Sequence, residues 1–172
     1  MAHCINAIIG TRRALARLIE RFGPPPPADL PFGLVIVPVN EQRLDWIAIS
    51  AERPLRGFTY LTQAMAEQIG AAIGDGRALY IETEYFGGSG GQAAALFEDG
   101  SLSWQGIDPD IDPPASPSWA ARLLRPPAVA RSPISEGLSR LGVPASAEED
   151  EFDQVGLHRF RSPEDLGLDS GD

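Results

Sequence analysis

Residues 77–104, RALYIETEYFGGSGGQAAALFEDGSLSW, decide the fold of this chain of 172 residues. From residue 79 to residue 86 the side chains alternate between two faces, with the period of two that a pleated strand imposes. The glycine-rich run at 87–91 predicts a flexible turn, and a returning strand follows at 92–97. Asp99-Gly100 is a tight-turn signal before a third strand. The stretch therefore predicts three consecutive antiparallel strands.

The chain before this stretch predicts further strands and two helices. Short apolar runs predict strands at 5–9, 33–39 and 44–50. Apolar side chains spaced three and four positions apart predict helices at 11–22 and 58–73. This order separates hairpins from helices, which parallel α/β folds do not do. We therefore predict an α+β fold, a mainly antiparallel sheet of about six strands with the two principal helices packed on it.

The chain after this stretch has a different composition. Residues 106–133 contain seven prolines and alternating aspartates, which predicts a proline-rich acidic segment. Helices are predicted at 118–125 and 133–141, and an added edge strand at 155–161. The length suits one domain with its own core.

These features define the predicted domain organisation. We predict a single domain over residues 1–161, which includes the proline-rich segment, and a flexible tail at 162–172.

The charge of the chain restricts its partners. The formal net charge is −10, with −3 in residues 1–100 (11 acids, 8 arginines) and −7 in residues 101–172 (13 acids, 6 arginines). A field of this sign disfavours nucleic acid, because phosphate neutralisation needs clustered cations. No apolar run approaches the roughly 20 residues that span a bilayer. We expect no membrane partner, a cytoplasmic protein without a signal peptide, and either plain solubility or a basic protein partner.

Glu82 and Glu84 are the strongest candidates for chemistry. They share one face of a predicted strand, with Cβ atoms roughly 7 Å apart. Paired carboxylates at such a distance can act as acid and base in glycoside hydrolysis. A small hydrolase that uses this pair, with help from His158, is therefore the alternative function. Both residues lie on one strand, however, whereas a substrate bond normally lies between carboxylates of different elements.

Other motifs do not complete a reactive site. The glycine run at 87–91 joins two strands, and it lacks the Gly-Lys-Ser/Thr of a phosphate loop and the following helix. Asp108 begins a D-x-D-x-D spacing, but Pro113 replaces the glycine that a calcium loop needs. One cysteine, Cys4, and two histidines at opposite ends of the chain form no zinc set. We predict no catalytic residue, no metal and no cofactor.

Two segments resemble small bacterial proteins of one type. Residues 80–94, YIETEYFGGSGGQAA, followed by Asp99-Gly100, resemble a motif of small bacterial proteins. Residues 138–143, 150–153 (DEFD) and 156–159 (GLHR) resemble their closing part. Proteins of this build are similar to immunity proteins encoded beside polymorphic toxins of contact-dependent or type VI secretion systems. The resemblance implies a cytoplasmic antitoxin that binds one cognate toxin domain, and it carries over no functional residues.

These observations favour a non-catalytic immunity protein that binds and neutralises a basic toxin domain. An acidic surface would speed the encounter with a cationic partner, and aromatic anchors would supply the centre of the interface. A scaffold that pairs with itself through strand edges is a third possibility. The predicted partner-binding residues are Glu82, Glu84, Tyr85, Phe86, Glu98, Asp99 and Phe152.

Overall fold

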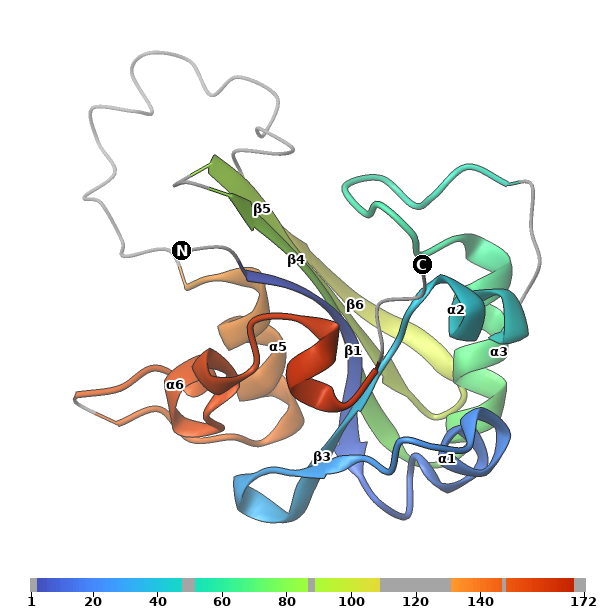
Figure 1. Ribbon diagram of the computed structural model, residues 1–172, viewed down its shortest axis with the longest axis horizontal. Coiled ribbons are helices and arrows are strands. Elements are labelled where there is room, and N and C mark those ends of the chain that lie inside the picture. Colours follow the sequence, from blue (N-terminus) through green and yellow to red (C-terminus); the bar gives the residue numbers. More distant parts are fainter. Residues whose placement is uncertain (1–2, 48–51, 87–88, 109–130, 147, 169–172) are drawn as a thin grey trace.

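The computed structural model describes residues 3–47, 52–86, 89–108, 131–146 and 148–168. Its centre is one six-stranded sheet in the order β2-β3-β1-β4-β5-β6, and every neighbouring pair is antiparallel (Figure 1). The predicted α+β class is confirmed. The strands are β1 (His3–Thr11), β2 (Ala28–Asp29), β3 (Leu34–Pro38), β4 (Arg77–Phe86), β5 (Ser89–Glu98) and β6 (Ser101–Ile107).

Helices cover both faces of the sheet, and each face has its own apolar core. The helices α1, α2 and α3 lie on one face, which we call the α3 face. Helix α5 packs on the other face, the α5 face, with residues that follow α6 (Figure 1). The helices are α1 (Ala16–Phe22), α2 (Glu41–Ile47), α3 (Gln63–Ile73), α5 (Pro133–Leu141) and α6 (Glu151–Gln154), with 3-10 turns η1 (Pro31–Gly33), η2 (Leu157–Arg159) and η3 (Pro163–Leu166).

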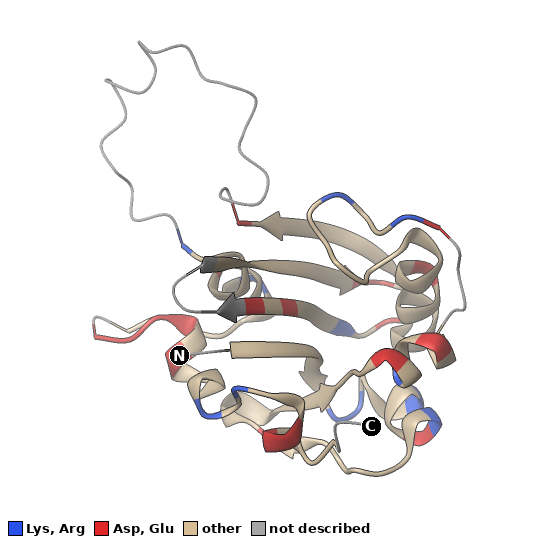
Figure 2. Cartoon of the chain, turned by 45° about the horizontal axis from the view of Figure 1, so that its top comes forward, with Lys and Arg blue, Asp and Glu red and all other residues tan. Residues whose placement is uncertain are grey.

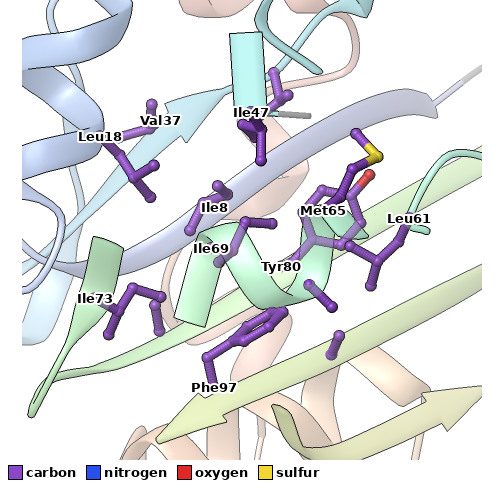
Figure 3. Packing of buried hydrophobic residues seen from close by; sticks show 14 of the residues in the cluster. Ile8, Leu18, Val37, Ile47, Leu61, Met65, Ile69, Ile73, Tyr80 and Phe97 are labelled. Atoms are coloured by element: carbon purple, nitrogen blue, oxygen red, sulfur yellow. The ribbon is translucent and has the colours of Figure 1, made fainter. Parts of the chain in front are cut away.

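The core of the α3 face explains why α3 packs where it does. Ile8, Tyr80 and Phe97 project from the three neighbouring strands β1, β4 and β5, and all three are fully buried. Met65 and Ile69, one turn apart on α3, lie over these side chains (Figure 3). Burial of side chains of this size contributes roughly 1.5–3 kcal/mol each, so this contact fixes α3 on the sheet.

The predicted strand at 44–50 is wrong, because its first part belongs to the helix α2. The side chain of Asn40 accepts a hydrogen bond from the backbone N–H of Arg43 at 3.0 Å, which caps the first turn. Arg43 and Leu44 then lie on the buried side of the helix. Residues 48–50 lie outside the described residues.

Both predicted principal helices are confirmed, but each begins later than predicted. Thr11 is the last residue of β1, and its hydroxyl accepts from the N–H of Ala14 in the turn before α1. The side chain of Thr62 accepts from the N–H of Met65, so α3 begins after Thr62 and not at residue 58. In both cases a threonine hydroxyl satisfies an N–H that a longer helix would have bonded internally.

The predicted edge strand at 155–161 is wrong. Val155 and Leu157 are buried on the α5 face, where the chain forms the short helix α6 and the turn η2. The segment from 162 to 168, which was predicted to be a flexible tail, forms η3 and buries Leu166 and Leu168. Both segments form helical turns whose apolar side chains pack on the α5 face of the sheet. The short apolar run at 155–157 had suggested a strand.

The predicted helix at 133–141 is confirmed as α5, with the hydroxyl of Ser132 accepting from the N–H of Ser135. The predicted helix at 118–125 and most of the proline-rich segment lie outside the described residues.

A substitution at Gly70 of α3 tests the contact between this helix and the turn that joins β5 to β6. A Cβ atom at Gly70 would collide with the backbone carbonyl of Gly100. We expect Gly70→Ala to destabilise the fold by about 1–3 kcal/mol, although alanine is the better helix former by about 1 kcal/mol. Urea unfolding measures the free energy. Gln68→Ala, on the exposed side of α3, is the control and stays within about 0.5 kcal/mol; a stabilised Gly70→Ala would contradict the packing.

Candidate functional site

Glu82 lies in β4, and its side chain points to the α3 face with only 6% exposed. One carboxylate oxygen accepts from the backbone N–H of Thr59 at 2.6 Å. The other accepts from the N–H groups of Tyr60 and Leu61, both at 3.0 Å, and from the hydroxyl of Tyr80 at 2.9 Å. Three consecutive backbone N–H groups thus bind one side chain. We call this arrangement the Glu82 clamp.

The environment of the clamp shifts the pKa values of the Glu82 carboxyl and of the Tyr80 hydroxyl. Burial raises the pKa of the Glu82 carboxyl, whereas the hydrogen bonds from Thr59, Tyr80, Tyr60 and Leu61 act in the opposite direction. Burial also raises the pKa of the Tyr80 hydroxyl, and the charge of Glu82 raises it further, so Tyr80 keeps its proton and donates. Both oxygens of Glu82 are therefore occupied by protein donors.

Glu84 has a different environment, although it shares a face of β4 with Glu82. Glu84 is exposed, whereas Glu82 is buried under residues 59–61. An acid–base pair needs both carboxylates to face one bound substrate. The predicted carboxylate pair does not converge on a shared cleft, since the oxygens of one member bind protein donors and the other member faces solvent.

The clamp places Tyr60 beside acidic side chains at the surface. Tyr60 is 37% exposed. Partial burial raises the pKa of its hydroxyl, and the negative charges of Glu41, Glu84 and Glu82 raise it further. Glu41 comes from α2, whereas Glu82 and Glu84 come from β4. We call the surface formed by Glu41, Tyr60 and Glu84 the Tyr60 patch.

Helix α2 carries further exposed acidic and aromatic side chains on this part of the α3 face. Asp45 lies one turn after Glu41 and is exposed, and the next residue, Trp46, is 41% exposed. Figure 2 shows acidic residues on α2 and towards the end of β4, with the arginines of α1 elsewhere on the same face. Acidic and aromatic side chains therefore occur together around this part of the α3 face.

Two predicted site residues lie at the other end of the sheet. Glu98 is paired with Arg77 across β4 and β5, with an Nε to Oε1 distance of 2.6 Å. Asp99 occupies the β5–β6 turn with a φ of 49°, a conformation that aspartate tolerates better than most residues. Glu84 is seven residues from Arg77 along β4, a separation of roughly 23 Å. Glu98 and Asp99 therefore do not belong to the Tyr60 patch.

The aromatic residues of the predicted site are also separated. Phe152 lies on the α5 face, where its ring is 5.6 Å from the ring of His3. Tyr85 and Phe86 pair with Gly90 and Ser89 at the end of the β4–β5 hairpin, but their side chains lie outside what the structure describes. Of the seven predicted residues, only Glu84 is described on the Tyr60 patch, and Glu82 supports it from beneath.

His3 and Cys4 are neighbours in β1 with side chains on opposite faces of the strand, and His158 lies in η2. Nδ1 of His3 lies 2.8 Å from the hydroxyl of Thr83, and burial lowers the pKa of His3. His158 lies 3.4 Å from Asp153. Burial raises the pKa of the Cys4 thiol, and the charge of Glu84 raises it further, which favours the thiol over the nucleophilic thiolate. Within the described ranges, no group of three or more histidine, cysteine or acidic residues could hold a metal ion.

Sequence reasoning missed Tyr60 and Arg43. Tyr60 precedes α3 without a pattern of its own, and only the contact with Glu82 places it. Arg43 is 3% exposed, donates to the carbonyls of Pro38 and Pro24 at 2.7 and 2.8 Å, and lies over the ring of Phe22. The polar cap at Asn40 was the local signal that could have placed Arg43 in a helix.

Comparisons with protein-family models, with curated proteins and with solved structures find no significant match to this chain. Among the helices that the structure describes, none has the length and apolar character needed to cross a membrane.

The Glu82 clamp can be tested by replacing one oxygen with a donor. In Glu82→Gln, an amide NH₂ takes the place of an oxygen that accepts from backbone N–H groups. A buried N–H without an acceptor costs about 1–3 kcal/mol, so we expect destabilisation of that size in urea unfolding. Tyr80→Phe removes one of the four hydrogen bonds and is expected to cost about 1 kcal/mol.

Glu84→Gln is the matched control, because it makes the same change on the exposed neighbour of the same strand face. We expect its free energy of unfolding to stay within about 0.5 kcal/mol of the wild type. Equal effects of the two glutamine variants would contradict a structural role for Glu82.

Proposed function

We propose that this protein is a non-catalytic binding protein of the immunity type, which neutralises a basic toxin domain through the Tyr60 patch. The observation that carries the proposal is the Glu82 clamp, which fixes Tyr60 at the surface next to Glu84. The carboxylate of Glu82 positions the patch, and the carboxylates of Glu41 and Glu84 meet the partner.

The composition of the patch supports a cationic protein partner. Tyrosine is enriched at the centres of interfaces, because its ring buries a large area while its hydroxyl finds a partner. Acidic groups around such a ring attract a positively charged surface, accelerate association and exclude acidic competitors. The net charge of −10 adds a long-range field of the same sign.

The rigidity of the segment around Tyr60 supports a tight complex. The N–H groups on either side of the Tyr60 backbone bind the same buried carboxylate as Tyr60 itself. A segment that is ordered before binding loses less conformational entropy when the complex forms. A binding protein gains from this arrangement, whereas a hydrolase would need the carboxylate of Glu82 free for substrate.

The proposal predicts that a secreted protein with a toxic C-terminal domain is encoded beside the gene for this chain, and that domain is the partner for the test. We expect that domain to arrest bacterial growth and this protein to relieve the arrest when both are expressed. We expect the double variant Glu41→Lys/Glu84→Lys to bind that domain about tenfold to a hundredfold more weakly in calorimetry, because two attractive contacts become repulsive.

Glu20→Lys is the control, because it makes the same charge reversal at an exposed position of α1. It retains growth protection and loses less than about threefold in affinity, and its melting temperature matches that of the double variant. Unrelieved growth arrest with the wild type, or equal binding by wild type and double variant, would refute the proposal.

A further inference from the structure

A cleft of about 580 Å³ lies at the end of the sheet opposite the Tyr60 patch. It forms where β1 ends, α3 ends and β4 begins, beside the first residues of α1. Its volume falls within the range of small-molecule sites. Arg13, Arg17, Arg77 and Asp75 are the charged residues that line it.

Two close contacts, one between the turns and one between the paired ends of β1 and β4, bring these arginines together. A Cβ atom at Gly76 would lie 2.8 Å from the Cβ of Ala14, and a Cβ at Gly10 would lie 3.1 Å from the carbonyl oxygen of Arg77. The turn after β1 therefore packs closely against the turn before β4, next to the paired ends of these two strands. Arg13 and Arg77, distant in sequence, reach the same cleft for this reason.

The three guanidinium groups differ in how far they are occupied. Arg77 donates to Glu98 at 2.6 Å and to the carbonyl of Arg140, so its position is held. Arg17 makes one long contact of 3.4 Å with the carbonyl of Ala71. Among the described residues, the guanidinium of Arg13 has no hydrogen-bond or ion-pair partner. Arg13 and Arg17 thus have most of their N–H donors available to a ligand.

We propose that this cleft binds the phosphate monoester of a small polyhydroxylated molecule, such as a sugar phosphate. Guanidinium groups match the oxygens of a phosphate in geometry and charge, so Arg13 and Arg17 hold the phosphate. Asp75 accepts hydrogen bonds from hydroxyl groups of the sugar and repels ligands that carry a second anion. Because Glu98 offsets the charge of Arg77, the specificity rests on Arg13, Arg17 and Asp75.

This site is independent of the proposed toxin contact, because the Tyr60 patch lies roughly 23 Å away along β4. The test therefore needs no toxin. Calorimetry on the full chain with ribose 5-phosphate, ribose and inorganic phosphate distinguishes the contributions of the ester and the hydroxyls. We expect ribose 5-phosphate to bind more tightly than phosphate, ribose not to bind, and added salt to weaken binding.

Variants of exposed residues on one short segment give the matched comparison. Arg13→Gln/Arg17→Gln lowers the affinity for ribose 5-phosphate by about tenfold or more, and Arg13→Gln alone lowers it by a smaller factor. Arg21→Gln, at the far end of α1, retains the affinity. Asp75→Asn reduces the preference for ribose 5-phosphate over inorganic phosphate.

Three results would overturn the assignment. The first is the absence of heat and of any shift in melting temperature at about 10 mM ribose 5-phosphate, where even a weak millimolar site is filled. The second is equal affinity of the wild type and Arg13→Gln/Arg17→Gln. The third is equal affinity for ribose 5-phosphate and inorganic phosphate, which would remove the role of Asp75.

Discussion

The hydrogen bonds between the Glu82 carboxylate and three consecutive backbone N–H groups hold the α3 face together. A carboxylate in a core is costly without donors, and buried N–H groups are costly without an acceptor. Here each satisfies the other. The contact joins a central strand to the segment that leads into α3, so the position of that helix and the exposure of Tyr60 both depend on it.

A second buried charged residue, Arg43, also binds the backbone of a loop, but it binds carbonyl groups where Glu82 binds N–H groups. Arg43 donates to backbone carbonyls of the proline-rich connector after α1, and its guanidinium lies 5.2 Å from the ring centre of Phe22. Proline residues offer carbonyl acceptors but no N–H, so a run of prolines cannot form a complete ladder of hydrogen bonds within a sheet, and here a side chain binds a carbonyl of the run. One buried anion thus binds loop N–H groups, and one buried cation binds loop carbonyls, on the same face of the sheet.

Local signals predicted the three-stranded stretch and α5, because alternation, turn glycines and the helical spacing of apolar residues act over a few residues. They failed at α2, where Leu44 and Trp46 alternate with Asp45 and Ile47 as in a strand, while the deciding contact is the cap at Asn40. The difference between Glu82 and Glu84 was also beyond local reasoning. The period of two places both on one face, and only a loop from elsewhere in the chain buries one of them.

That difference assigns separate roles to two neighbouring acids. The buried one cannot reach a partner, because its oxygens are bound by Thr59, Tyr60, Leu61 and Tyr80, but it determines which side chains surround the exposed one. In the proposed function, Glu84 would contact the partner and Glu82 would position the surface around it, so both roles would come from a single strand. A hydrolytic pair would require two free carboxylates, and the four donors on Glu82 therefore argue against Glu82 and Glu84 acting as such a pair.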